Sequence, residues 1–240
     1  VVDSLAARLA DEAEFYFVRA RCAEALGYVA LDHPGEVIDP SMLADLRVGL
    51  SFDRPAVKEK LAKALASVAL GDPGRLRHQV GSLAEHLSDD SELVRYHLCT
   101  ALVVVGCERP AALADAADAL SDRLADESSY VRGRAAEALG LLAGADDQID
   151  VAPLSEAIPD DEDAPAFLTD RVRFARQALA DDGPTDPSPE VGTVQSVREG
   201  TDDVVAAITA PDEDAECPHC GLEVPDGGPP VCPGCGLPQN

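Results

Sequence analysis

The chain has 240 residues, 46% of them hydrophobic, so it can bury a sizeable core, and disorder throughout its length is excluded. Aromatic residues make up only 4% and tryptophan is absent, which favours closely packed helices rich in Ala, Leu and Val. The 45 acidic and 19 basic residues give a net charge of −26, which excludes a general attraction to nucleic acid in the absence of a local basic face.

A block of similar sequence recurs five times in the first 180 residues. In each copy a valine precedes a basic residue and then a ladder of alanine and leucine, as in VRGRAAEALGLLA from Val131. The apolar positions of a copy share one face of a helix, so each copy is predicted to be amphipathic and helical. The copies begin at Val18, Val57, Val94, Val131 and Arg171, the last shifted by one residue, and their ladder leucines are Leu26, Leu65, Leu102, Leu139 and Leu179.

A second apolar series precedes most of these helices and predicts a partner helix for each. Leu83 and Leu87 are typical of it, with the four-residue spacing of one helix face. Short acidic turns with serines that can cap the next helix join the two, while Pro and Gly separate successive pairs. One pair cannot bury its own apolar face, so about five pairs are expected to stack over residues 1–180. The sequence therefore predicts an all-α class, an α-α superhelix whose second helices line the concave side.

The ladder resembles the HEAT-repeat family, including its phycobilin-lyase-like branch. The residues that carry the resemblance are Asp126, Val131, Arg132, Ala136, Ala138, Leu139 and Gly140. The resemblance implies a HEAT-like solenoid and, most often, a protein-interaction scaffold or adaptor. The rival tetratricopeptide repeat would need a Trp and Tyr signature that the chain lacks. Iron-binding members of the family use His-Glu dipeptides, and none occurs here.

Two columns of basic residues run along the predicted second helices. Arg19, Lys58, Arg95 and Arg132 follow the repeat valines and are expected to bridge to the acidic turns at Asp53, Asp89 or Asp126. A second column lies two residues further on and is predicted to form an exposed line that binds an acidic partner. This line consists of Arg21, Lys60, His97 and Arg134. No motif of catalysis was found among the five histidines or elsewhere, so no catalytic residue is assigned.

Residues 181–210 are predicted to be an acidic linker. Within it, Thr201-Asp202-Asp203 precedes Val204, Val205 and Ile208 and can start a two-turn helix that would cap the solenoid. The alternative is a solvated acidic arm.

Residues 211–240 carry two Cys-x-x-Cys pairs, Cys217 with Cys220 and Cys232 with Cys235. Four thiolates at this spacing predict one closed, structural Zn²⁺ site, with Gly221 and Gly236 allowing the backbone to turn beneath the sulfurs. The pattern resembles the zinc-ribbon family. Rubredoxin-like iron binding and disulfides are the alternatives, and the absence of aromatic residues after Cys217 disfavours the first.

Taken together, these patterns predict a non-enzymatic protein-interaction scaffold with one structural zinc ion and an unidentified protein partner. The first alternative is a nucleic-acid-associated factor that uses the basic residues and the ribbon. The second is a HEAT-type enzyme such as a bilin-lyase-like protein. The acidic, lysine-poor composition resembles proteins of salt-accumulating archaea, which would explain the charge as halophilic adaptation. No apolar run of membrane-spanning length and no leader was found, so a cytoplasmic location without membrane contact is expected.

Overall fold

The computed structural model describes residues 1–37, 40–51, 54–145, 165–179, 191–210, 220, 222 and 233–236. Within these ranges the regular structure consists of α-helices and short 3-10 helices. The chain divides into two compact units, Val1–Glu199 and Gly200–Asn240. None of the helices in the described ranges combines the length and apolarity needed to span a membrane.

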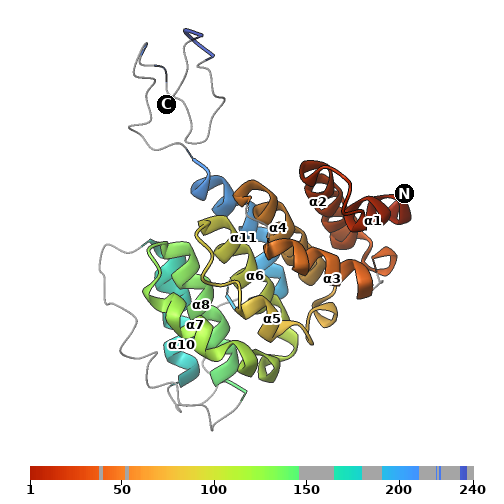
Figure 1. Ribbon diagram of the computed structural model, residues 1–240. Helices are drawn as coiled ribbons and strands as arrows, with labels where there is room; N and C mark the ends of the chain where they lie inside the picture. The colour runs from red at the N-terminus through yellow and green to blue at the C-terminus, as the bar shows by residue number, and fades with distance from the viewer. Residues whose placement is uncertain are drawn as a thin grey trace. The chain divides into compact units, whose positions relative to one another are not determined.

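The first unit is a series of helical pairs (Figure 1). The first helices of the pairs are α1 (Val2–Ala10), α3 (Pro40–Val48), α5 (Val80–Ala84) and α7 (Ala117–Asp122). The second helices are α2 (Tyr16–Asp32), α4 (Pro55–Gly71), α6 (Glu92–Glu108), α8 (Ser129–Ala143) and α10 (Ala166–Leu179). Short 3-10 helices connect them: η1 (Pro34–Glu36), η2 (Gly49–Ser51), η3 (Pro73–Arg75), η4 (Pro110–Ala116) and η5 (Arg123–Ala125).

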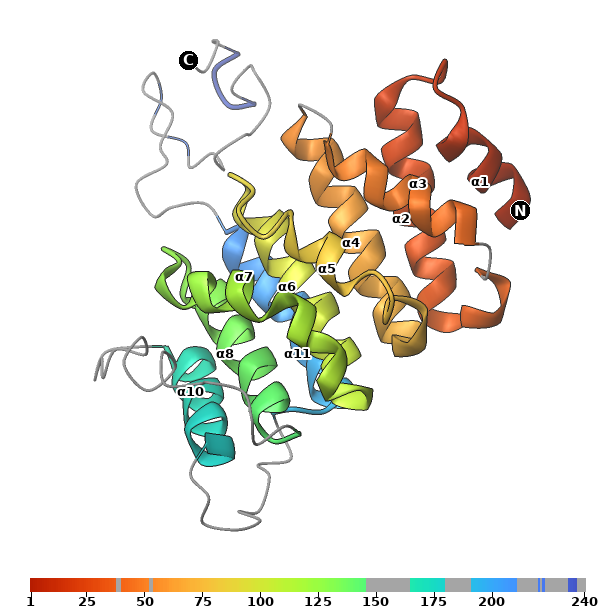
Figure 2. The same cartoon turned by 60° about the horizontal axis from the view of Figure 1, so that its bottom comes forward.

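The second helices stack in chain order: α2 packs on α4, α4 on α6, α6 on α8, and α8 on α10. In α2 and α8 a glycine follows the ladder leucine and permits this close approach. A Cβ atom at Gly27 would lie 2.9 Å from the Cα of Ala64, and one at Gly140 would lie 2.8 Å from the Cα of Ala175. The helices α5 and α7 lie together on one side of α6 and α8 (Figure 2). This is the two-layered repeat that the sequence predicts.

All five ladder blocks form second helices, which confirms the predicted repeat. The first helices differ more from expectation. The helix α5 has only 5 residues and α7 has 6, and the rest of their apolar series lies in turns and in η5. The first helix expected for the fifth pair falls in residues 146–164, outside the described residues. The ladder leucines Leu26, Leu65, Leu102 and Leu139 are all buried, so the apolar stripe is the core of the stack.

The linker expected over residues 181–210 needs correction over residues 191–199. This segment packs within the first unit, where Val191 and Val197 are 2% and 0% exposed. The helix that includes its end, α11 (Val194–Ile208), begins well before the predicted start at Thr201 and has 15 residues. Residues 180–190 lie outside the described residues. The apolar spacing of Val191, Val194 and Val197 explains why this part of the acidic segment is helical and buried.

Candidate interaction surface

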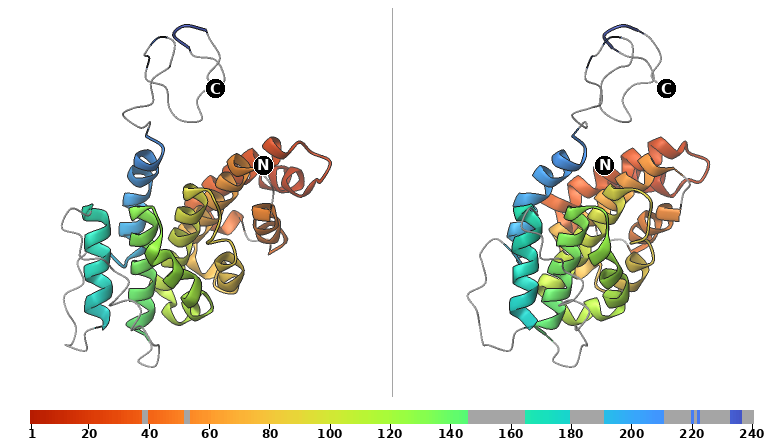
Figure 3. Two further views of the ribbon diagram at one scale, coloured as in Figure 1. Left: turned by 60° about the vertical axis from the view of Figure 1, so that its left-hand side comes forward. Right: turned by 90° about the vertical axis from the view of Figure 1, so that its left-hand side faces the viewer.

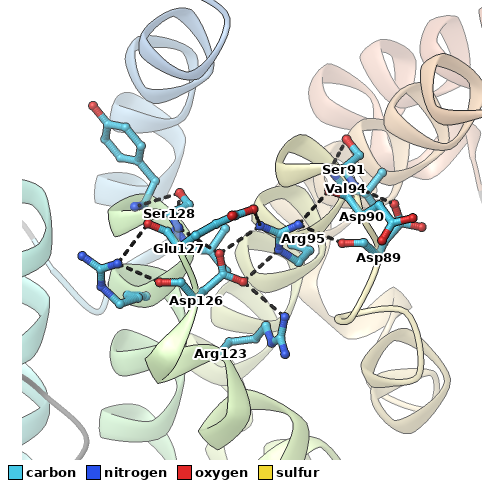
Figure 4. A network of polar contacts seen from close by, with 12 residues as sticks. Asp89, Asp90, Ser91, Val94, Arg95, Arg123, Asp126, Glu127 and Ser128 are labelled. Atoms are coloured by element: carbon cyan, nitrogen blue, oxygen red, sulfur yellow. Dashed lines mark hydrogen bonds and ion pairs between the residues drawn. The ribbon is translucent and has the colours of Figure 1, made fainter.

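The turn between the helices of a pair is built in the same way in the third and fourth pairs (Figure 4). The Oδ1 atom of Asp89 accepts a hydrogen bond from the Ser91 amide at 3.0 Å, and Asp126 accepts one from the Ser128 amide at 3.0 Å. The Ser91 and Ser128 hydroxyls accept hydrogen bonds from amides in the first turns of α6 and α8. The predicted serine caps are therefore confirmed, and each aspartate closes its turn.

Basic side chains of one pair bind the turn of the next pair. The Arg95 guanidinium donates to both carboxylate oxygens of Asp126, at 2.8 and 3.0 Å, and Lys58 Nζ lies 2.5 Å from Asp89 Oδ2. Burial lowers the pKa of Arg95, but its hydrogen bonds and charge interaction with Asp126 hold that pKa above the ordinary value. The bridges expected from Lys58 and Arg95 to the acidic turns are confirmed. They fix the register between successive pairs.

The other two basic residues that follow a repeat valine, Arg19 and Arg132, donate to backbone carbonyls. Arg19 Nε donates to the Leu9 carbonyl at 2.7 Å, and Arg132 Nη1 donates to the Asp126 carbonyl at 2.7 Å. Asp53, a predicted partner, lies outside the described residues. Arg19 and Arg132 are thus held by the turn or first helix of their own pair.

Two clefts lie side by side along these turns. The larger, of about 320 Å³, is lined by Ser88, Asp89, Asp90, Arg95, Asp122, Arg123, Ala125, Asp126 and Glu127. The smaller, of about 280 Å³, shares Ser88, Asp89 and Asp90 with it and adds Lys58, Glu85 and His86. The basic side chains Lys58, Arg95 and Arg123 in these clefts are paired with Asp89 or Asp126. The turn edge, defined as Glu85, Asp90, Asp122 and Glu127, therefore has an excess of carboxylates.

The predicted binding line of basic residues is not a continuous surface. Arg21 is exposed and lies 2.6 Å from Glu24, and Lys60 Nζ lies 3.5 Å from the same carboxylate. His97 and Arg134, by contrast, are only 3% and 0% exposed. Their assignment to an exposed line is wrong because α6 and α8 are covered on this side, whereas α2 is open. Burial, with a smaller contribution from the charge of a nearby lysine, lowers the pKa of His97 to about 3, so this histidine is neutral.

Arg134 belongs to a buried ionic cluster that the sequence did not reveal. Its Nη1 atom lies 2.8 Å from Glu137 Oε2, and Arg171 Nε lies 2.9 Å from the same oxygen. The Gly192 amide donates to Glu137 Oε1 at 2.9 Å, and the Tyr96 hydroxyl is 3.3 Å from Arg134 Nη2. Burial raises the pKa of Glu137, but the two arginines outweigh it and hold that pKa below 4.5. The available signal was an Arg-x-x-Glu pair inside the apolar ladder.

The second unit holds the described part of the cysteine module. Cys220 and Cys235 are both exposed, while Cys217 and Cys232 lie outside the described residues. The residue after Cys235, Gly236, has a φ of +73°, the left-handed conformation expected for a glycine at that place. A Cβ atom at Gly234 would lie 3.5 Å from the Cys220 sulfur, so the two Cys-x-x-Cys segments approach each other.

A family model and several solved structures support the fold. A family model for HEAT repeats matches residues 80–180. An engineered protein solved by the Northeast Structural Genomics Consortium superimposes with a TM-score of 0.62 at 20% identity, over 86% of each chain. A designed armadillo repeat protein in complex with the peptide (KR)4 has a TM-score of 0.62 at 18% identity, over 82% of this chain and 98% of its own. Computationally designed armadillo repeat proteins for modular peptide recognition have a TM-score of 0.62 at 20% identity, over 74% of this chain and 82% of theirs. A search of the curated proteins found no match.

The chain is an α-repeat protein of the HEAT/armadillo type, an all-α solenoid. Such folds typically serve as protein-interaction scaffolds, and function resides in the surface that a particular chain presents.

Proposed function

We propose that this protein is a non-enzymatic scaffold that binds basic segments of partner proteins. The observation that supports this proposal is the pairing of its basic side chains. Lys58, Arg95, Arg134 and Arg171 on the second helices each contact a carboxylate of the chain itself. The two clefts along the turns are lined by six acidic residues against Lys58, Arg95 and Arg123, so a cationic ligand is electrostatically favoured and an acidic ligand is not.

The proposal changes the charge of the partner that the sequence suggested. A continuous basic line would have favoured an acidic protein or a nucleic acid, but His97 and Arg134 are buried and Arg21 and Lys60 share Glu24. A similar fold, the designed armadillo repeat protein named above, was solved with the basic peptide (KR)4. That likeness concerns the fold alone, yet it makes the same peptide a rational first probe.

Two cysteines outside the zinc module fit a role without nucleophilic catalysis. Burial raises the pKa of the Cys99 thiol to about 12, and it raises the pKa of the Cys107 thiol to about 12 as well. A thiol that stays protonated is a poor nucleophile. These residues are therefore expected to pack as small apolar side chains.

Fluorescence anisotropy with labelled (KR)4 tests the scaffold proposal. We expect the wild-type protein to bind this peptide, and to bind an (DE)4 peptide and a single-stranded DNA of equal length at least about tenfold more weakly. The double variant Asp90→Asn, Glu127→Gln should bind (KR)4 less tightly. The matched control is Asp202→Asn, Asp203→Asn, which removes the same charge from α11.

The control separates a binding surface from the general attraction of an acidic protein. If both double variants lose affinity equally, the turn edge is not the binding surface. Tighter binding to DNA than to the basic peptide would overturn the proposal in favour of a nucleic-acid factor.

We further propose that Cys217, Cys220, Cys232 and Cys235 hold one structural Zn²⁺ ion. The left-handed Gly236 and the approach of Gly234 to the Cys220 sulfur support two facing knuckles. A four-thiolate shell is closed and leaves no position for a catalytic water, so its contribution would be to fold this segment. Elemental analysis of the purified protein should find one zinc per chain, and Cys220→Ser should lower that ratio, whereas Cys22→Ser should not. Iron or no metal after expression with adequate zinc would contradict the assignment.

A further inference from the structure

Residues 191–199 cross the stack of second helices on the side away from α5 and α7 (Figures 1 and 3). At one end, the Gly192 amide donates to the buried Glu137 carboxylate on α8 at 2.9 Å. At the other end, Arg198 Nη2 donates to the carbonyl of Leu70 near the end of α4 at 2.8 Å. Since α6 packs between α4 and α8, the segment must pass over α6. We call the outer side of α4, α6 and α8 the second-helix face.

The sequence of α6 requires a cover on this face. Every residue from Val94 to Gly106 is buried, including Val103 and Val104, so α6 lacks the polar side of an ordinary surface helix. A helix that is apolar all round must be covered on all sides. Its neighbours α4 and α8 and the first-helix layer cover three sides, and the second-helix face is the fourth.

The contacts of the segment are those of a bound ligand. Val191 and Val197 are buried, whereas Gln195 and Glu199 are exposed, so an apolar side faces the repeats and a polar side faces outward, while Arg198 reaches back to α4. Gly192 has a φ of +79° and lies against the Phe174 ring, where a Cβ atom would come within 2.8 Å. The second-helix face thus offers an apolar strip with a hydrogen-bond acceptor at each end, the Glu137 carboxylate and the Leu70 carbonyl.

The end of the face near Leu70 favours a cation. The carbonyls at the end of α4 attract positive charge through the helix dipole, whereas Glu137 at the other end is already paired with Arg134 and Arg171 and accepts only a neutral amide. A partner helix that matches this face would place a free backbone amide near its start, where it can donate to Glu137. It would place a cationic side chain about two turns later, where that side chain can donate to the Leu70 carbonyl. At the end near Leu70, residues 191–199 carry one arginine and one glutamate, whose charges cancel. Their binding is therefore strengthened little by the negative field of a chain with net charge −26. A basic amphipathic helix would gain more.

We propose that residues 191–199 are an intramolecular ligand of the second-helix face, and that a basic amphipathic helix of a partner binds there by displacing them. This inference goes beyond the proposed scaffold function, because it names a second site for a basic partner, separate from the turn edge, and the segment that regulates access to it. A tethered ligand acts at high effective concentration, so it weakens the apparent affinity of any competitor for the same face. A partner with few basic residues would not displace residues 191–199 from the second-helix face, whereas a strongly basic one would.

Two full-length variants test this inference by loosening either end of the segment. Arg198→Ala removes the hydrogen bond to α4, and Gly192→Ala introduces a Cβ atom at a positive φ against Phe174. The matched control is Arg173→Ala, which removes an exposed arginine from α10. The probe is a labelled synthetic peptide of residues 191–210, added in trans and followed by anisotropy, with circular dichroism to verify folding.

Both variants should bind the trans peptide about tenfold more tightly than the wild type, because a lost hydrogen bond to a charged donor changes a binding constant by roughly that factor. Arg173→Ala should resemble the wild type. If folded Arg198→Ala and Gly192→Ala proteins bind the peptide no more tightly than the control, the inference is overturned.

The same titration with (KR)4 separates this inference from the scaffold proposal. Binding of the trans peptide without binding of (KR)4 would sustain the inference and contradict the basic-partner proposal. Equal binding of (KR)4 by all four proteins would sustain the scaffold proposal, because this short peptide is expected to bind the turn edge, and the trans-peptide affinities alone then decide the inference.

Discussion

The guanidinium of Arg95 on α6 donates two hydrogen bonds, of 2.8 and 3.0 Å, to the carboxylate of Asp126 in the turn before α8. Their side chains are 6% and 2% exposed. The same guanidinium donates to the carbonyls of Asp89 and Asp90 in its own turn. One side chain therefore joins two successive turns, and the stacking of the third and fourth pairs depends on it.

Removing one partner of this pair should be costly. Asp126→Ala leaves Arg95 buried without its carboxylate and the Ser128 amide without its acceptor, so we expect a loss of about 3–5 kcal/mol in the free energy of unfolding. Glu127→Ala is the matched control, since Glu127 also contacts Arg95, at 3.2 Å, but its side chain is 84% exposed. That control should change stability by about 0–1 kcal/mol. Urea unfolding followed by circular dichroism measures both, and equal effects would show that the bridge contributes little.

Arg21 and Arg134 occupy equivalent positions of the repeat and should respond very differently to the same change. Arg134→Glu would place a second carboxylate beside buried Glu137, so a loss of at least about 3–5 kcal/mol is expected. Arg21→Glu affects an exposed contact with Glu24 and should cost about 0–1 kcal/mol. Thermal unfolding of the two single variants tests whether Arg134 is buried while Arg21 is exposed, or whether both arginines are exposed. Comparable melting temperatures would contradict it.

The sequence was a good guide to the repeat because the signal is periodic and apolar. The ladder leucines occupy the same place in every copy and their contacts recur from pair to pair, so each copy reports the same packing. The bridges from Lys58 and Arg95 could be predicted for the same reason. Their partners lie one repeat away, at a fixed place in the pattern.

Burial of polar residues could not be predicted, because it depends on where a pair lies in the stack and on a segment outside the repeat. Arg21 with Glu24 and Arg134 with Glu137 share one spacing and nearly one sequence, yet the Arg21 side chain is 69% exposed and Arg134 is fully buried. The difference comes from Arg171, in the last repeat, and from Gly192, which follows the repeats, since both contact Glu137. Residues 191–199 occur once in the chain, so no periodic sequence pattern predicts where they pack.

His97 should make the stability of the fold depend on pH between about 6.5 and 5. Burial, aided by the charge of Lys63, lowers the pKa of His97 to about 3 in the folded state, whereas its ordinary value is 6.5. Below pH 6.5 the unfolded chain takes up a proton that the folded chain does not, so stability falls as the pH falls. At pH 5 this loss amounts to about 2 kcal/mol.

The variant His97→Phe should remove that pH dependence, because phenylalanine cannot take up a proton. Urea midpoints measured from pH 7.5 to 5 should decline for the wild type and stay nearly level for the variant. His33→Phe is the control, since His33 is exposed, and it should decline like the wild type. Parallel curves for wild type and His97→Phe would mean that His97 is protonated in the folded state or is open to solvent.

Salt should stabilise the protein if its acidity reflects adaptation to concentrated salt, as we propose from the net charge of −26. At 0.1 M salt the Debye length is about 10 Å and carboxylates such as Glu85, Asp90 and Asp122 repel one another, whereas at 1 M it is about 3 Å and they do not. The buried bridge of Arg95 with Asp126 is poorly screened and should survive. The melting temperature is therefore expected to rise steeply with KCl, and to rise less in sucrose of equal osmolality, which does not screen charge. Identical melting temperatures at low and high KCl would contradict the proposal, and an equal rise in sucrose would assign the effect to solvent exclusion instead of charge.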